Sequence, residues 1–75
     1  MILGNIEAER GRAQMSKEAL SRTLGVTSRT YWNYIASGVI PSDKLVQMAR
    51  MFGCSTDYLL GLTDSRAPAM HRSGA

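Results

Sequence analysis

The spacing of apolar residues along the chain predicts helices and little β-structure. No stretch alternates apolar and polar residues for long, and the glycines and prolines fall between segments in which apolar residues recur every three or four positions. Five short helices are expected, over about 3–13, 17–24, 28–36, 43–52 and, last, within "TDYLLG" from Thr56. The predicted fold class is therefore all-α, a compact bundle of five helices.

Capping residues mark the expected helix ends. Ser16, Thr27, Ser42 and Ser55 each precede a predicted helix, and a hydroxyl at that position accepts a hydrogen bond from a free N–H of the first turn. Gly25 suits the left-handed conformation that ends a helix in a tight turn. Two helices joined by such a short, glycine-containing turn form the helix-turn-helix pattern.

Helical periodicity also predicts which side chains point inward. The expected core positions are Leu3, Ile6, Ala13, Ala19, Leu20, Thr23, Leu24, Leu45, Met48, Ala49, Phe52, Leu59 and Leu60. Met15 and Met51 are expected in or near the core, and Cys54 as a buried thiol. The acids Glu7, Glu9, Glu18, Asp43 and Asp57 are expected at helix starts or on exposed faces, where they favour solubility and the helix dipole.

The third predicted helix, "SRTYWNYIAS", has two different faces. Because successive residues turn by about 100°, Thr30, Tyr31 and Tyr34 share the inward side. Ser28, Arg29, Trp32 and Asn33 share the outer side with Ala36. Arg pairs bidentately with guanine, and Asn with adenine, in the major groove of DNA. The same residues also allow a simpler interpretation, in which Trp32 folds onto the core or serves a dimer contact and Arg29 is a solvated charge.

Composition narrows the possible functions. The chain has 75 residues, 44% of them hydrophobic, which predicts one small globular domain. Its net charge of +3 suits a nucleic-acid partner. One cysteine and one histidine, His71, make no metal-ligand set, and no nucleophile–base pair indicates an enzyme. We expect a cytoplasmic protein without cofactor, metal, membrane span or small-molecule ligand, with His71 solvated or a tag remnant.

The order of these motifs resembles the Cro/repressor-type helix-turn-helix family, also called XRE-like or lambda-repressor-like. The resemblance covers roughly residues 3–64 and rests on "MSKEALSRTLGVTSRTYWNYIASG" followed by "IPSDKLVQMARMFGCSTDYLLGLTD". It implies a helix-turn-helix DNA-binding domain over 1–64. The end of the chain has no helical period and contains Pro, Gly, Ser and Ala, so 65–75 are expected to be a flexible tail or truncated linker. The implied function is that of a sequence-specific transcriptional regulator, a repressor, whose helix at 28–36 reads the major groove of a double-stranded operator as a homodimer.

The resemblance also implies site residues. The implied base contacts are Ser28, Arg29, Trp32 and Asn33, and the implied phosphate contacts are Ser16, Lys17, Thr27, Ser37 and Gly38. The chain would be either a small Cro-like or immunity-type regulator or the DNA-binding part of a longer repressor.

Three departures from the family pattern matter. Lys17 stands where many members have Gln, and it can still reach a phosphate as a point charge. Ile35 stands where many have a Glu that pairs with the arginine at the position of Arg10, so Arg10 must reach solvent or find another acceptor. Val39 and Ile40 stand where many have polar residues.

The apolar pair Val39 and Ile40 predicts a symmetric dimer contact, with the surface around Tyr58 and Leu62 as the competing candidate. An alternative function remains, that of a protein-interaction module that keeps the fold without binding DNA. In that alternative Trp32, Ile35, Val39 and Ile40 would form the contact patch.

Overall fold

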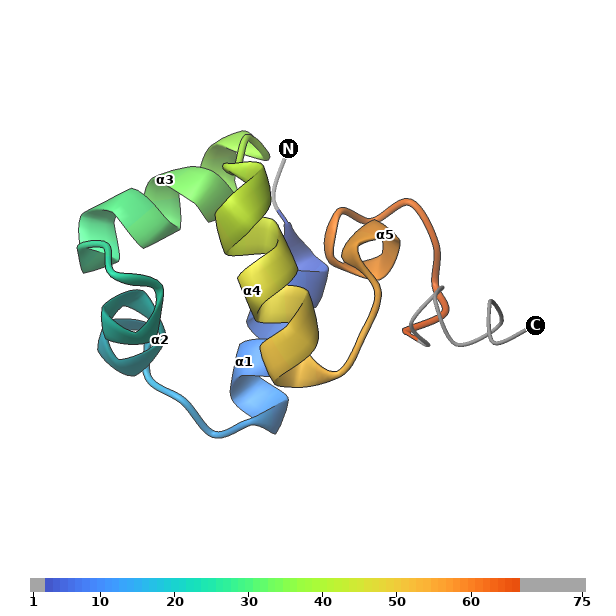
Figure 1. The fold of residues 1–75 in the computed structure, drawn as a ribbon, viewed down its shortest axis with the longest axis horizontal. Helices are drawn as coiled ribbons and strands as arrows, with labels where there is room; N and C mark the ends of the chain where they lie inside the picture. The colour runs from blue at the N-terminus through green and yellow to red at the C-terminus, as the bar shows by residue number, and fades with distance from the viewer. Residues whose placement is uncertain (1–2, 67–75) are drawn as a thin grey trace.

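A computed structural model describes residues 3–66 of the protein. Within that range the chain forms five helices and no strand (Figure 1). The helices are α1 (Gly4–Arg12), α2 (Lys17–Leu24), α3 (Ser28–Ser37), α4 (Ser42–Phe52) and α5 (Thr56–Leu59). The all-α prediction of a five-helix bundle with a helix-turn-helix is therefore confirmed. His71 and most of the predicted tail lie outside the described residues.

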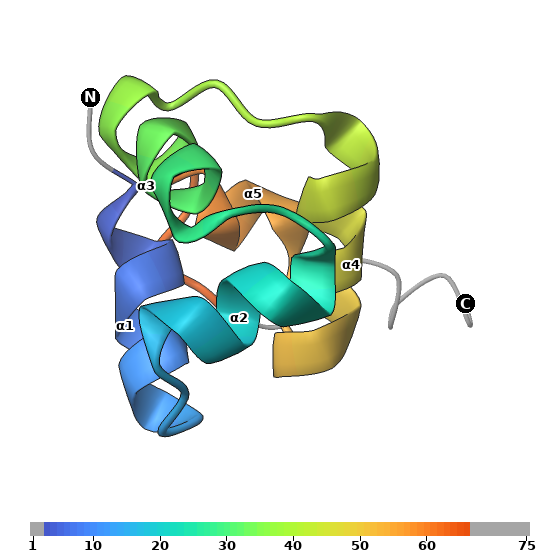
Figure 2. The same cartoon turned by 90° about the vertical axis from the view of Figure 1, so that its left-hand side faces the viewer.

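The arrangement places the helix-turn-helix at one side of the bundle. In Figure 1, α2 lies below α3 at the left, α4 runs down the middle and α5 lies at the right. After a turn of 90°, α2 lies in front, with α3 above it and α1 and α4 on either side (Figure 2). Helix α5 contacts both α1 and α4, and α1 also contacts α3. The α2–α3 pair is thus supported from behind by the rest of the bundle.

Three of the predicted N-caps are confirmed. The hydroxyl oxygen of Ser16 accepts a hydrogen bond from the N–H of Ala19, and those of Thr27 and Ser55 accept equivalent bonds in α3 and α5. The predicted glycine end of α2 is also confirmed, because Gly25 takes a φ of 77°.

The prediction that Ser42 caps α4 is wrong, because Ser42 is the first residue of that helix. Pro41 is the N-cap, in an extended conformation with φ −60° and ψ 140°. Its carbonyl accepts the N–H of Leu45 at 3.0 Å, which is the first hydrogen bond of α4. The helix therefore starts at the proline, and the Ser42 side chain makes no capping hydrogen bond.

One hydrophobic core fills the bundle. Its buried members are Leu3, Ile6, Leu20, Leu24, Tyr31, Ile35, Leu45, Met48, Ala49, Cys54 and Leu59, with Met15, Val26, Ile40, Phe52, Tyr58 and Leu60 packed against it. Most predicted inward positions are confirmed, Cys54 included. Ala13, Thr23 and Met51 are exposed, contrary to the prediction. Ala13 follows the last turn of α1, and the Thr23 hydroxyl donates to the carbonyl of Ala19 on the solvent side.

Glu9 is buried, although the sequence predicted an exposed helix acid. Its side chain is 2% exposed and accepts hydrogen bonds from Arg66 Nη2 at 2.9 Å and from the Tyr58 hydroxyl at 3.3 Å. Arg66 also donates to the carbonyl of Phe52 at 2.8 Å. Burying a carboxylate is costly unless it is paired. Arg66, which pairs with Glu9, lies 57 positions further along the chain, and helical periodicity gives no information about a contact over that separation.

Glu7 is a second acid that the structure uses internally. It accepts hydrogen bonds from Arg10 Nη2 at 2.8 Å and from the Tyr31 hydroxyl, which joins α1 to α3. Arg10 also donates to the carbonyl of Met15 at 2.8 Å, so it holds the loop between α1 and α2. The prediction that Arg10 must reach solvent or find another acceptor in place of residue 35 is thus resolved: Arg10 finds two acceptors.

We expect the free energy of unfolding to fall in acid. Hydrogen bonds from Arg10 lower the pKa of Glu7, and those from Arg66 lower the pKa of Glu9. Because both pKa values are lower in the folded protein, the unfolded chain binds more protons as the pH falls. The stabilisation is complete above about pH 5 and is lost as the pH drops below about 4.3 towards the folded values.

Urea unfolding between pH 7 and pH 3 measures this loss, with the double variant Glu7→Gln, Glu9→Gln as the control. The variant should show a flatter dependence of unfolding free energy on pH. An identical dependence in the two proteins would contradict the assignment.

Candidate nucleic-acid interface

The turn between α2 and α3 is held by side chains from α4. Lys44 Nζ donates to the carbonyl of Leu24 at 2.8 Å, and Gln47 Nε2 donates to the carbonyl of Thr23 at 3.0 Å. The last carbonyls of a helix have no partner within the helix, and a cation is favourable at that end. These two contacts therefore fix the end of α2, from which the chain turns into α3.

Lys44 and Gln47 are not among the site residues that the sequence predicts. Their spacing of three residues does indicate a shared polar face on α4. Which helix end that face meets depends on how α4 packs against α2, and that is a tertiary property. The sequence thus indicates the polar face of α4 but does not indicate that this face contacts the end of α2.

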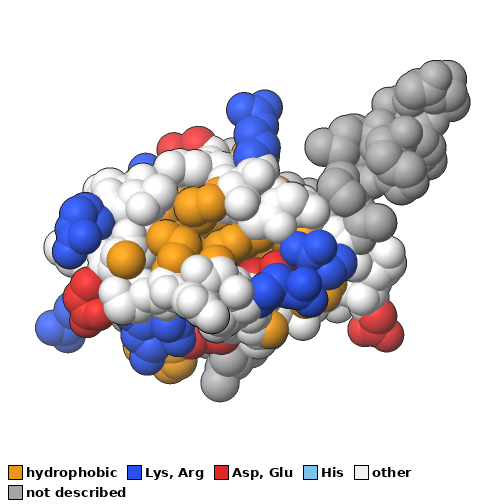
Figure 3. Space-filling view, turned by 90° about the horizontal axis from the view of Figure 1, so that it is seen from below, with side chains coloured by type: hydrophobic (Ala, Val, Ile, Leu, Met, Phe, Trp, Pro, Cys, Tyr) orange, Lys and Arg blue, Asp and Glu red, His pale blue; other side chains and the backbone are white. Residues whose placement is uncertain are grey.

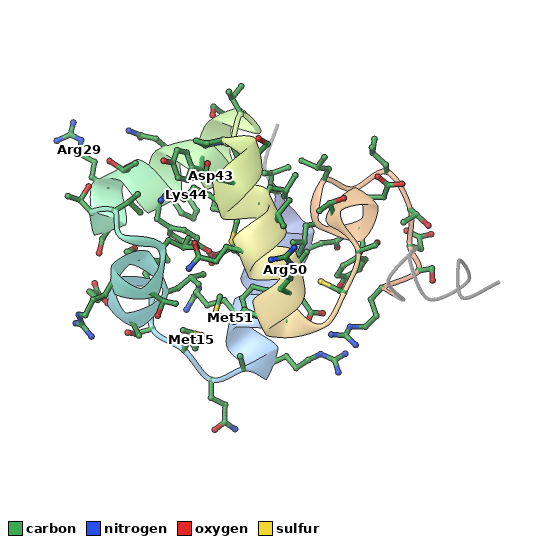
Figure 4. All side chains as sticks on the ribbon, viewed as in Figure 1. Met15, Arg29, Asp43, Lys44, Arg50 and Met51 are labelled. Atoms are coloured by element: carbon green, nitrogen blue, oxygen red, sulfur yellow. The ribbon has the colours of Figure 1, made fainter. Side chains whose placement is uncertain are left out.

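The outer face of α3 is exposed as predicted. Arg29 and Asn33 are exposed, Trp32 is 40% exposed and Ser28 is partly buried. Arg29 points away from the bundle at the beginning of α3 (Figure 4). The structure therefore brings a guanidinium, an amide and a hydroxyl to one side of α3, on which Arg29 and Asn33 are exposed.

The buried face of α3 differs from the predicted one. Tyr31 and Ile35 are both fully buried, whereas Thr30 and Tyr34 are only partly buried. Tyr31 and Ile35 are four residues apart and share one stripe, so the helix is rotated towards Ile35. Ile35 is therefore unavailable for the contact patch of the alternative interaction-module function, and its assignment to that patch is wrong.

The beginning of α2 also faces the predicted interface. The Ser16 oxygen accepts the N–H of Ala19, which leaves its O–H free to donate. The Lys17 ammonium lies over the Trp32 ring, 4.4 Å from the ring centroid. The first N–H groups of a helix and a nearby cation together favour an anion such as phosphate.

The remaining predicted phosphate contacts already use their donors inside the protein. The Thr27 hydroxyl donates to Thr30 Oγ1, the Ser37 hydroxyl donates to the carbonyl of Asn33, and the N–H of Gly38 donates to the carbonyl of Tyr34. Each of these three donors would have to exchange its partner to bind a phosphate. Ser16 and Lys17 are better placed for that role.

The predicted dimer residues differ in exposure. Val39 is 74% exposed and Leu62 is 72% exposed. Ile40 and Tyr58 pack against the core, and the Tyr58 hydroxyl binds Glu9. Each candidate dimer surface thus keeps one exposed apolar residue.

The surface on the lower side of the protein, as oriented in Figure 1, is more hydrophobic than the exposed face of α3. It shows a hollow of hydrophobic side chains bordered by Lys and Arg groups (Figure 3). Met15 and Met51 lie at this end of the bundle, and α3 lies at the opposite end (Figure 4). This apolar surface is therefore separate from the exposed face of α3.

Neither a membrane span nor a metal site is found within residues 3–66. None of the helices there is long and apolar enough to cross a membrane. No three His, Cys, Asp or Glu side chains in the same range gather closely enough to hold a metal ion.

The fold and the exposed α3 face define a helix-turn-helix bundle, and one comparison agrees with that class. The chain is 40% identical over 60 residues to the uncharacterized HTH-type transcriptional regulator YobD of Bacillus subtilis (strain 168). The match covers 79% of this chain and 54% of that protein, so the chain spans about half the length of its curated relative. No protein-family model and no solved structure matches the chain.

Proposed function

We propose that this protein is a sequence-specific DNA-binding regulator of transcription, acting as a Cro/repressor-type repressor in the cytoplasm. The observation that carries the proposal is the exposed face of α3, where Arg29 and Asn33 lie on a helix held in place by the helix-turn-helix. Arg and Asn are the side chains that read guanine and adenine bidentately. The similarity to a protein named as an HTH-type transcriptional regulator supports the same function.

In the proposed complex, α3 enters the major groove and the beginning of α2 meets the DNA backbone. Ser28, Arg29 and Asn33 contact base edges. Ser16 and Lys17 contact phosphates, because the N-terminus of α2 combines free N–H groups, a hydroxyl donor and a cation. Phosphate contacts position a protein on the duplex, and base contacts select the sequence.

Selection of bound sequences from random duplex DNA tests this function. A dimer that reads two half-sites should enrich a palindromic sequence whose halves are about one helical turn apart, roughly 34–36 Å. Enrichment should disappear in the double variant Arg29→Ala, Asn33→Ala, which alters exposed side chains only. If the folded protein enriches no sequence and binds no duplex at low salt, the proposal is wrong.

We propose that the DNA-bound form is a homodimer and that Val39 lies in its contact surface. Replacing Val39 by Ser should weaken dimerisation by up to about 1.5–3 kcal/mol for each of the two Val39 side chains of the dimer, the value of burying one Val side chain. Sedimentation of the protein with and without a two-half-site duplex measures the change. Leu62→Ser is the matched control, because Leu62 is equally exposed and lies in the competing surface. A loss of dimerisation in Leu62→Ser alone would move the contact there, and a loss in neither variant would contradict both surfaces.

A further inference from the structure

One contact joins the two helices of the helix-turn-helix on their exposed side. Lys17 is the first residue of α2, and Trp32, the single tryptophan of the chain, lies in the middle of α3. The Lys17 ammonium lies 4.4 Å from the centroid of the Trp32 ring. The contact therefore connects the predicted phosphate-binding end of α2 with the predicted base-reading helix.

This geometry is that of a cation–π contact, and among aromatic side chains Trp binds a cation most strongly. An ammonium within about 6 Å of a Trp centroid is attracted by the negative face of the ring. Lysine has a flexible stem and loses much rotamer freedom when its head is fixed. Because the Trp32 ring already holds the ammonium in the free protein, the Lys17 side chain has less rotamer freedom left to lose when it binds a ligand.

The neighbouring charges leave the ammonium available for a ligand. Glu7 is close enough for Lys17 to contribute to its lowered pKa, but Arg10 and Tyr31 already donate to its oxygens. Trp32 is 40% exposed, so the contact lies at the surface and not in the core. An ammonium has three N–H donors, and the side turned away from the ring can meet a phosphate.

We propose that Trp32 is a positioning residue, which holds the Lys17 ammonium for a DNA backbone phosphate, and that it does not select a base. This inference rests on the proposed function. One face of the ring is covered by Lys17, and the covered face cannot pack against a base or sugar. Trp32 would then raise the affinity for all duplexes through Lys17 and leave the preferred sequence unchanged.

A double-mutant cycle on DNA affinity tests the proposal. Lys17→Ala, Trp32→Ala and the double variant are titrated with the selected duplex and with a scrambled duplex, at several salt concentrations. Lys17→Ala should lower affinity on both duplexes and reduce the salt slope by about 0.9, as the loss of one phosphate contact does. Trp32→Ala should lower affinity on both duplexes by roughly two- to fivefold, the range of an exposed cation–π contact.

The decisive comparison is Trp32→Ala in the Lys17→Ala background, where it should have no further effect. Trp32→Phe keeps an aromatic face and should restore most of the affinity. Arg22→Ala is the matched control, because Arg22 is another exposed cation of α2. The effects of Arg22→Ala and Trp32→Ala should multiply independently.

Two results would overturn the positioning role while leaving the proposed function intact. One is an equal loss from Trp32→Ala with and without Lys17, and the other is a changed base preference in Trp32→Ala. Absence of binding to any duplex by the folded wild-type protein would overturn the proposed function as well. Circular dichroism of each variant verifies folding, and Trp32→Leu, which removes the aromatic ring but keeps a large apolar side chain, replaces Trp32→Ala if Trp32→Ala does not fold.

Discussion

Replacing Arg29 by Ala is expected to weaken binding to the selected duplex by about 1–3 kcal/mol and to relax the preference at one base pair. Arg29 is exposed at the beginning of α3 and points away from the bundle (Figure 4). Its side chain can therefore be removed without opening the core. The loss reflects a bidentate contact with guanine that Ala cannot make.

Affinity for a panel of duplexes with single base-pair changes measures this effect. The wild-type protein should discriminate strongly at one position at which Arg29→Ala discriminates weakly. Arg50→Ala is the matched control, since Arg50 is an exposed arginine on α4 (Figure 4). It should leave the base preference unchanged. An equal loss of affinity for Arg29→Ala on every duplex would identify Arg29 as a phosphate contact.

Replacing Tyr31 by Ala is expected to destabilise the fold by about 3–5 kcal/mol, the usual cost of removing a buried aromatic side chain. Tyr31 is fully buried in α3, and its hydroxyl donates to Glu7 of α1. A tyrosine is protonated at neutral pH, and burial raises the pKa of Tyr31 further, so its hydroxyl remains a donor in alkaline solution as well. A domain of 75 residues has a total stability of only about 4–11 kcal/mol, so this loss would remove a large share of it.

Urea unfolding separates the two contributions of Tyr31. Tyr31→Phe keeps the ring and removes the hydrogen bond to a charged acceptor, which should cost about 1.5–3 kcal/mol. Tyr31→Ala should cost clearly more than Tyr31→Phe. Equal losses would mean that the ring contributes little to the core, and a negligible loss in Tyr31→Phe would mean that the Glu7 contact is not stabilising.

Local features of the fold could be predicted because they depend on neighbouring residues. The hydroxyls of Ser16, Thr27 and Ser55 cap helices within three positions of themselves. Apolar residues three or four positions apart predicted most of the buried positions. The prediction that Ser42 caps α4 is wrong for a local reason too, because the preceding residue, Pro41, is the N-cap of that helix.

The candidate site was predictable only in part. The exposure of Arg29 and Asn33 followed from their place on α3. Ile35 was misplaced because a helical wheel gives the relative directions of side chains and does not give the direction of the core. That direction is set by the helices against which α3 packs, and they bury Tyr31 and Ile35 together.

The sequence by itself determined the all-α class, the helix-turn-helix and the side chains available on α3, because helix periods and caps act within about four residues. Only the tertiary structure decided which remote groups meet. It paired Glu9 with Arg66 across 57 positions, brought Lys44 to the end of α2 and placed Lys17 over Trp32. The physical reason is that each of these contacts needs two segments to be packed in one relative position, and that position results from burying the whole core at once.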